Sequence, residues 1–185
     1  MLKRGSRVAA FATGPIRGAN TRKIILVCVV GRDGIIEGVL SDFVSGGGDD
    51  ATKVIARMVN RSRLKEQISI LATNGIALAG LNLIDPEKVE TKTGKRLIMI
   101  TRKRPNQKMM DKAIRTVYGT EEARERLRII HDKRLSIRKI EDFFVGGLSD
   151  PTDIGSGMIG RAVDTLRIAH LIARGISTGE SKGRI

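Results

Sequence analysis

The sequence predicts an α/β fold with a mixed β-sheet flanked by helices, in the element order βββαβαβαβα. The first third of the chain consists of β-branched apolar runs separated by glycine turns. The remainder alternates short apolar runs with segments whose apolar residues recur at helical spacing. No stretch rich in proline, serine or charge looks like a linker, so we expect residues 1–185 to form a single domain.

The opening of the chain predicts three antiparallel strands. They are RVAAFA (7–12), IILVCVV (24–30) and IIEGVLSDFV (35–44). The turn from Gly31 to Gly34 joins the second and third strands as a hairpin. A helix over 51–63 follows, and Asp49 or Asp50 is its natural N-cap.

Strands and helices alternate after residue 66, which calls for parallel crossovers. The predicted strands cover 67–73, 96–101 and 137–145, and the predicted helices cover 86–93, 105–131 with a break near Gly119, and 156–174. An antiparallel opening followed by βα units is typical of a ribonuclease H-like sheet, although other α/β folds share this order.

Positive charge indicates a nucleic-acid partner. The 34 Lys and Arg residues exceed the 20 Asp and Glu residues, and residues 102–139 hold 13 basic and five acidic side chains. The candidate contacts are Arg102, Lys103, Arg104, Lys108, Lys112 and Arg115. Four Phe, one Tyr and no Trp leave little for base stacking, which favours DNA over RNA. The alternative is a highly charged, solvated surface, since the chain has only five Asn and two Gln.

Several features resemble functional motifs but lack the context that those motifs require. GSGMIG (155–160) opens a helix without the preceding and following strands of a dinucleotide site. SGGGDDATK (45–53) lacks the phosphate-loop pattern, so we interpret it as a turn with an N-cap or, alternatively, as a metal ligand at Asp50. His170 lies on an apolar helix stripe that favours packing over catalysis, and His131 lies on another helix. 

Cys28 and the hydropathy of the chain bear on its location. Cys28 stands alone within ILVCVV, which predicts a buried, reduced thiol in a cytoplasmic protein. No run approaches the ~20 uninterrupted apolar residues of a membrane span. We therefore expect no membrane partner.

The stretch ATNGIALAGLN (72–82) contains the end of a predicted strand. Asn74 and Gly75 lie where the strand runs out. In many α/β enzymes such a strand end carries a carboxylate, whereas here it carries an amide. Gly75 and Gly80 predict a close-packed turn beside it.

Five segments together resemble the archaeal endonuclease dU family, which is related to endonuclease V and has a ribonuclease H-like fold. They are RVAAFATGP (7–15), EGVLSDF (37–43), DDATKVIARMV (49–59), NGIALAGLNLID (74–85) and LRIAHLIARGISTGESKGRI (166–185). The resemblance covers most of the chain in order. It implies an endonuclease whose carboxylates hold Mg²⁺ or Mn²⁺.

The chain departs from that family at most of the expected acids. The family's first strand ends in two aspartates before Gly-Pro, and these positions are Ala12 and Thr13 here. An aspartate of the glycine-rich turn corresponds to Gly47, and the acid of the later strand end corresponds to Asn74. Asp50 matches the pattern and is the expected catalytic acid.

Three hypotheses follow. The first is a catalytically degenerate relative that still binds nucleic acid and contains no metal. The second is an active nuclease acting on deaminated or damaged bases, with Mg²⁺ or Mn²⁺ held by relocated acids chosen from Asp42, Asp49, Asp50 and Asp85; Asp50 and Asp42 are the expected pair. The third is a scaffold whose basic face meets an acidic partner or further copies of itself, and a homodimer is possible.

Overall fold

A seven-stranded mixed sheet forms the centre of the computed structural model, which describes residues 5–16 and 23–181. Its strands are β1 (Arg7–Thr13), β2 (Lys23–Arg32), β3 (Ile35–Ser45), β4 (Ile68–Thr73), β7 (Arg96–Thr101), β8 (Ser136–Ile140) and β9 (Phe143–Gly147). The helices are α1 (Ala51–Arg61), α2 (Pro86–Thr93), α3 (Gln107–Val117), α4 (Thr120–Ile130) and α5 (Ser156–Thr178). Two 3₁₀ turns, η1 (Lys65–Gln67) and η2 (Pro151–Ile154), and a two-stranded ribbon of β5 (Ala77–Leu78) and β6 (Asn82–Leu83) complete the described structure.

The strand order β3-β2-β1-β4-β7-β9-β8 is that of a ribonuclease H-like sheet with a hairpin added at one edge. β3, β2 and β1 are antiparallel, as the short turn after β2 predicts, whereas β1, β4 and β7 are parallel. The prediction of a mixed sheet flanked by helices is confirmed.

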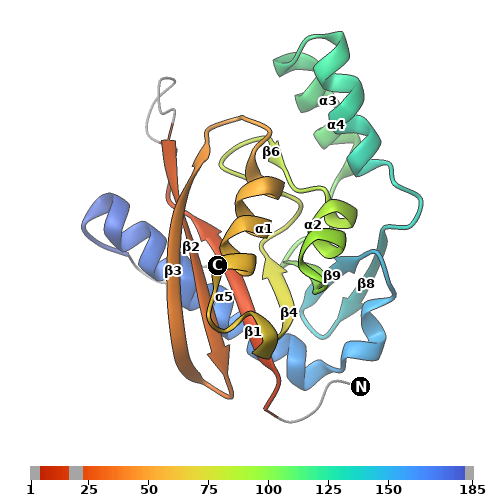
Figure 1. The fold of residues 1–185 in the computed structure, drawn as a ribbon. Helices are drawn as coiled ribbons and strands as arrows, with labels where there is room; N and C mark the ends of the chain where they lie inside the picture. The colour runs from red at the N-terminus through yellow and green to blue at the C-terminus, as the bar shows by residue number, and fades with distance from the viewer. Residues whose placement is uncertain (1–4, 17–22, 182–185) are drawn as a thin grey trace.

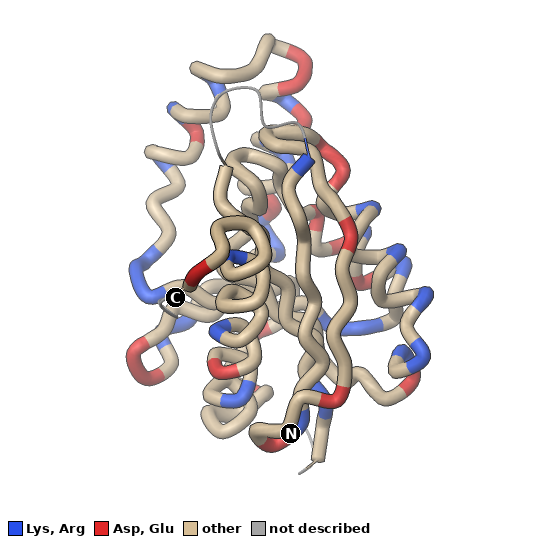
Figure 2. Tube along the Cα trace, turned by 90° about the vertical axis from the view of Figure 1, so that its left-hand side faces the viewer, with Lys and Arg blue, Asp and Glu red and all other residues tan. Residues whose placement is uncertain are grey.

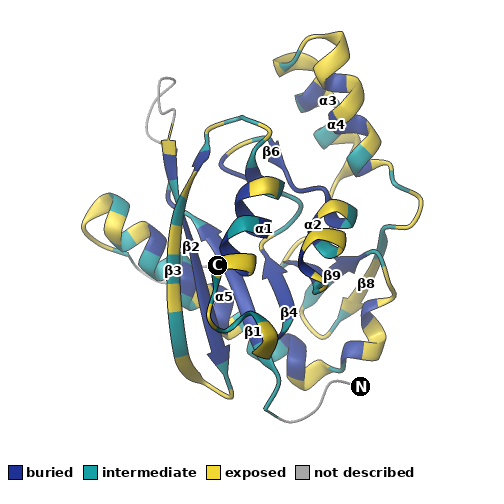
Figure 3. Ribbon diagram, viewed as in Figure 1, coloured by how far each residue is buried: buried dark blue, intermediate teal, exposed yellow. Residues whose placement is uncertain are grey.

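Helices cover both faces of the sheet (Figure 1). Apolar side chains of α1 and α2 pack with one face of β1, β2 and β4. The buried stripe of α5 packs against the other face. Figure 3 shows that the central strands are buried and that β3, at one edge, is largely exposed or intermediate. The sheet therefore lies between two layers of helix, with β3 incompletely covered.

The expected strand over 137–145 is wrong. The segment folds as two antiparallel strands, β8 and β9, with a turn at Glu141 and Asp142. Glu141 adopts φ = 52°, which turns the chain within an otherwise strand-like run. β9 pairs antiparallel with β7, so the last crossover is also not parallel as expected.

The expected helix over 105–131 is two helices, α3 and α4, and they meet at the predicted break at Tyr118 and Gly119. Asn106 caps α3 by accepting a hydrogen bond from the Met109 N–H. The pair packs on the β5–β6 ribbon and stands at the opposite side of the molecule from β3 (Figure 1). In the described part of the chain, no helix combines the length and the apolar content that a membrane crossing needs.

The glycine pattern at 155–160 does open α5, as expected, but the 3₁₀ turn η2 precedes it rather than a strand. This context excludes the dinucleotide-binding arrangement, in which a strand leads directly into the glycine turn. His170 is half-buried on α5. Burial lowers the pKa of its imidazole, and the charge of Arg174 lowers it further.

Candidate functional site

The structure brings the expected strand-end positions together. Phe11 of β1 pairs with Thr73 of β4, so Ala12 and Asn74, one residue further on, lie at adjacent strand ends. The Asn74 side chain is exposed there. Gly75 turns the chain with φ = 81°.

Ala12 and Thr13 lie on opposite faces of the sheet. Ala12 is 4% exposed and belongs to an apolar cluster with Ala169 and Ala173 of α5. Thr13 is half-buried and pairs with Leu26, on the α1 side. A carboxylate at position 12 would therefore lie against an apolar helix surface.

The carboxylate of Asp50 accepts hydrogen bonds from three protein groups. The Ser45 N–H donates at 3.0 Å, the Ser45 hydroxyl at 2.8 Å and the Asn82 side-chain amide at 2.7 Å. Burial raises the pKa of Asp50, but these hydrogen bonds lower it more, so the pKa lies below its usual 3.8. Asp50 thus joins the end of β3 to the start of α1 and is ionised at neutral pH.

Asn82 performs the capping that was expected of an aspartate. Asp50 occupies the N-cap position of α1, but its side chain makes no capping hydrogen bond. Instead, the Asn82 side-chain oxygen accepts from the Ala51 N–H at 3.0 Å, and Asn82 is fully buried. Asn82 was not among the residues expected at the site, although an amide within the apolar run of 76–84 indicates a buried polar contact.

Two other candidate acids, Asp42 and Asp85, also interact with basic side chains of the protein. Asp42 forms an ion pair with Arg57 of α1 at 2.7 Å. Asp42 of β3 pairs with Leu26 of β2, and Leu26 pairs with Thr13 of β1. Two strand spacings, about 10 Å, therefore separate the Cα atoms of Asp42 and Thr13. Burial raises the pKa of Asp42, while hydrogen bonds from the Phe43 N–H and Arg57 lower it, with a net decrease.

Asp85 caps α2. Its side chain accepts from the Lys88 N–H at 3.2 Å, and its carboxylate lies 3.2 Å from the Lys88 ammonium and 3.4 Å from Arg128. Asp49 is exposed beside Asp50. The relocated acids proposed from the sequence therefore serve structural contacts, apart from Asp49.

The donor set at the strand ends does not fit Mg²⁺ or Mn²⁺. Both ions favour carboxylate oxygens and water, and Mg²⁺ is bound through one or two carboxylates together with substrate phosphates. Ala12, Thr13 and Asn74 supply a methyl group, a hydroxyl and a neutral amide. Across residues 5–16 and 23–181, no three His, Cys, Asp or Glu side chains gather in a way that could hold a metal ion.

The glycine turn at Gly47 is hydrogen-bonded to residues of the α3–α4 pair. The Tyr118 hydroxyl donates to the Gly47 carbonyl at 2.7 Å, and the Arg126 guanidinium lies 3.7 Å from the centre of the Tyr118 ring. Arg126 also donates to the Gly48 carbonyl at 3.0 Å. Gly47 has φ = 63°, in the left-handed region that favours glycine.

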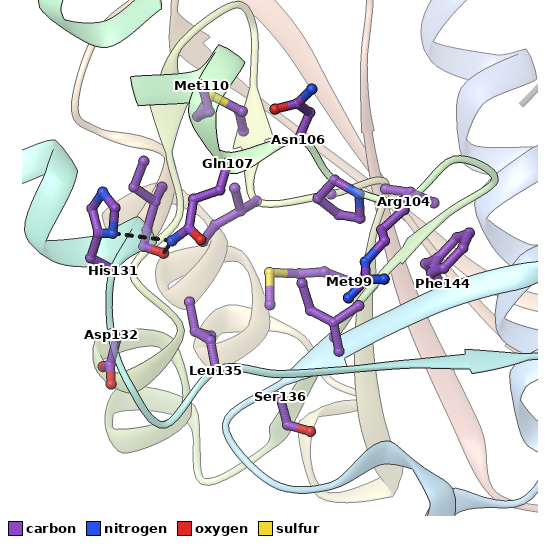
Figure 4. A pocket seen from close by; sticks show the side chains of 18 of the residues that line it. Met99, Arg104, Asn106, Gln107, Met110, His131, Asp132, Leu135, Ser136 and Phe144 are labelled. Carbon is purple, nitrogen blue, oxygen red and sulfur yellow. Dashed lines mark hydrogen bonds between the residues drawn. The ribbon is translucent and has the colours of Figure 1, made fainter. Parts of the chain in front are cut away.

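A cavity of about 680 Å³ opens beside Asn74, between the ends of β4 and β7, the start of α3, the end of α4, and β8 (Figure 4). Apolar side chains, including Met99, Met110 and Phe144, form much of its wall. The cavity is not visible in the sequence because its lining comes from separate segments between Asn74 and Gly146 that only the fold brings together.

Polar groups gather at the same cavity. The Gln107 side-chain N–H donates to the Ile130 carbonyl at 3.0 Å and lies 3.1 Å from the His131 Nδ1, while the other ring nitrogen of His131 lies 3.0 Å from Asp111. The Ser136 hydroxyl is buried and has no hydrogen-bond partner among the described residues. The site therefore combines apolar surface with amide and hydroxyl groups.

The six expected nucleic-acid contacts lie between β7 and the outer surface of α3. All six are exposed, and Arg104 also lines the cavity. Arg102 lies 5.7 Å from the centre of the Phe143 ring. None of the six forms an ion pair with another described residue. By contrast, Arg124, Arg128 and Arg134, from the second half of the same basic segment, are each paired with an acid.

Comparison with known proteins places this chain among archaeal relatives. A family model described as "Endonuclease dU" matches residues 4–177. A UPF0215 protein of Methanothermobacter thermautotrophicus is 30% identical, over 98% of this chain and 93% of the relative. A UPF0215 protein of Methanopyrus kandleri is 32% identical, over 89% of this chain and 88% of the relative.

A solved structure has a similar fold. The crystal structure of a protein of unknown function from Archaeoglobus fulgidus superposes with a TM-score of 0.77. It is 26% identical, and the match covers 92% of this chain and 97% of that one.

Proposed function

Because the chain belongs to the endonuclease dU family, we propose that it binds nucleic acid and has lost metal-dependent hydrolysis. One observation carries this proposal: the adjacent ends of β1 and β4 present Ala12 and Asn74 and no carboxylate. The glycine turn and the strand ends are retained, so the shape of the site persists without the charge that would hold a divalent metal.

The condition of Asp50 supports the same proposal. Three donors from Ser45 and Asn82 occupy its carboxylate. Using Asp50 as a metal ligand would require some of these hydrogen bonds to break, and a single carboxylate supplies only part of a metal site. We propose that Asp50 stabilises the turn between β3 and α1 and does not bind a metal ion. We propose the same of Asp42, which is ion-paired with Arg57.

The proposed nucleic-acid contacts are the unpaired cations Arg102, Lys103, Arg104, Lys108, Lys112 and Arg115. A cation without an intramolecular acid is available to neutralise a phosphate and to release its counterions. The low aromatic content supports backbone contact over extensive stacking, and hence DNA over RNA. Cys28 is a buried free thiol, which supports a reducing, cytoplasmic location.

A second candidate function is an active Mg²⁺- or Mn²⁺-dependent nuclease for deaminated or damaged bases. The cavity beside Asn74 favours it, because a base turned out of its stack needs a pocket with apolar walls and groups that pair with its edge. Phe144 and Met99 offer such a wall, and Gln107 and Ser136 offer such groups. In this case Asp49 and Asp50 would have to supply the metal ligands.

The test is a combined binding and cleavage experiment with the purified full chain. Fluorescein-labelled DNA and RNA oligonucleotides, unmodified or with one uracil or hypoxanthine, are titrated at 50 to 500 mM NaCl and then incubated with Mg²⁺ or Mn²⁺. We expect binding that weakens steeply with salt and no metal-dependent cleavage. Asp50→Ala serves as the comparison variant.

Two outcomes contradict the proposal. Cleavage that needs metal and disappears in Asp50→Ala supports the active nuclease instead. Failure to bind any oligonucleotide at 50 mM NaCl removes the nucleic-acid partner and leaves the scaffold hypothesis.

A further inference from the structure

One edge of the sheet is long, apolar and open. β3 has 11 residues and is the terminal strand in the sheet order. Its large apolar side chains are 47–60% exposed: Ile35, Ile36, Val39 and Phe43. An exposed edge of this length is a template for pairing with another strand.

The opposite edge of the same sheet is protected. β8 has five residues and carries exposed Arg138 and Lys139, the type of charge that discourages strand addition. β3 contains no lysine, arginine or proline. Its two acids are neutralised within the chain, Glu37 by Arg7 and Arg32, and Asp42 by Arg57.

The backbone of β3 has polar groups that face the open side. The N–H groups of Phe43 and Ser45 donate to side-chain acceptors, Asp42 and Asp50 respectively, which indicates that they point away from β2. Alternate residues of a strand direct their N–H and C=O groups the same way. Val39 and Ser41 therefore direct theirs outward as well.

One side-chain face of β3 is also uncovered. Leu40 and Val44 pack toward the α1 side, so Val39 and Phe43 point to the α5 side. On that side α5 packs mainly against β1 and β2 and also contacts β4. The C-terminal end of α5 extends past β3 in Figure 1, and Ile176, near that end, is 63% exposed.

We propose that β3 pairs antiparallel with β3 of a second copy of this chain, about a two-fold axis at Ser41. The pairing extends the sheet across the two copies. On each side of the axis it places Val39 opposite Phe43 of the partner subunit, which is a favourable β-branched–aromatic pair. Both α5 helices then lie on the same face, where they cover these side chains.

Charge supports a second copy as the occupant of this edge. In this register Asp42 lies opposite Leu40 of the partner subunit, so it does not face an acid directly. Figure 2, which looks at this edge, shows that β3 is uncharged along most of its length. The unpaired cations of α3 lie on the opposite side of the molecule from β3, so pairing through β3 keeps these cations of the two copies apart.

The arrangement leaves the proposed nucleic-acid face free at both ends of the dimer. If that proposed function holds, the dimer presents two basic surfaces and gains affinity for long nucleic acid by bivalency. The dimer itself does not depend on nucleic acid.

The test measures molar mass by light scattering after gel filtration, at 0.5 M NaCl so that bound nucleic acid cannot bridge two copies. We expect a mass about twice the 20.2 kDa of the chain. Val39→Lys/Phe43→Lys should reduce it to that of one chain, whereas Ile137→Lys on the protected β8 edge should not. Circular dichroism of each variant reports whether it has folded.

A cross-linking variant keeps the test independent of folding defects. Ser41→Cys sits on the proposed axis, where the paired Cα atoms lie at about 5.5 Å, within disulfide range. Under mild oxidation we expect a covalent dimer, and none from the exposed Ser149→Cys, while Cys28 is buried and does not interfere. A wild-type mass of one chain at up to 100 µM, or a dimer that withstands the double lysine variant and yields no Ser41→Cys cross-link, overturns the proposal.

Discussion

The side-chain amide of Asn82 donates a hydrogen bond of 2.7 Å to the carboxylate of Asp50. Through its oxygen, the same amide accepts from the Ala51 N–H at the start of α1. One buried residue, 31 positions away in the chain from Ala51, thereby donates to the carboxylate of Asp50 and caps α1.

Asn82→Ala should destabilise the protein by about 1–3 kcal/mol, because the buried Ala51 N–H loses its acceptor and Asp50 loses a donor. The free energy of unfolding in urea measures this effect. Asn74→Ala, at an exposed position, is the matched control and should change it by less than about 0.5 kcal/mol. Equal losses in both variants would contradict the structural assignment of Asn82.

The ionised form of Asp50 should contribute stability that depends on pH. Burial opposes ionisation, but the hydrogen bonds from Ser45 and Asn82 outweigh it and lower the folded-state pKa below 3.8. The contribution is therefore complete above the unfolded-state pKa and is lost as pH falls through the folded-state value. Unfolding free energies of wild type and Asp50→Asn should differ most between pH 5 and 7 and converge toward pH 2. A difference that stays constant over this range would argue against a lowered pKa.

Removal of unpaired cations should weaken nucleic-acid binding more than removal of paired ones. Lys108→Gln/Lys112→Gln/Arg115→Gln should lower affinity and reduce the slope of log K against log [salt] by about 2–3, since each phosphate contact contributes about 0.9 on duplex DNA. Fluorescence anisotropy at several salt concentrations measures both quantities.

The control for this experiment comes from the same basic segment. Arg124→Gln removes one cation that is paired with Glu121, and its effect on the salt slope should be close to zero. A similar loss of slope per cation in both proteins would mean that general charge, and not this face, governs binding.

Acidic substitutions at the strand ends should make the melting temperature of the protein depend on a divalent metal ion. Thr13→Asp/Asn74→Asp places two carboxylates at adjacent strand ends, and a divalent ion that binds them stabilises the folded protein by mass action. Melting temperature should rise by a few degrees in 5 mM Mn²⁺ for the double variant and not for wild type or Asn74→Asp. We exclude Ala12→Asp from this test because its side chain would be buried against α5.

No metal-dependent rise in the melting temperature of the double variant would mean that the strand ends no longer have the shape of a metal site. A rise in the wild type would mean that the existing acids already bind the ion.

Local patterns in the sequence determined most of the fold. Period-two and period-3.6 apolar patterns depend on near neighbours, so β1 to β3, α1 and the break at Gly119 lie where the residues predict them. Membership of the endonuclease dU family was also visible in the residues alone. The hairpin of β8 and β9 was not, because IRKIEDFFV carries a continuous strand-like pattern and only the turn at Glu141 divides it.

Only the tertiary structure decided which contacts the candidate site residues make. Asp50 was expected to cap a helix, but the side chain of the distant Asn82 caps α1 instead, and the Asp50 carboxylate accepts hydrogen bonds from Ser45 and Asn82. The cavity beside Asn74, the burial of Ala12 under α5 and the open edge of β3 likewise arise where distant segments meet or fail to cover one another. Sequence periodicity reports which face of an element is apolar, whereas contacts between elements determine which polar group is satisfied and which surface stays exposed.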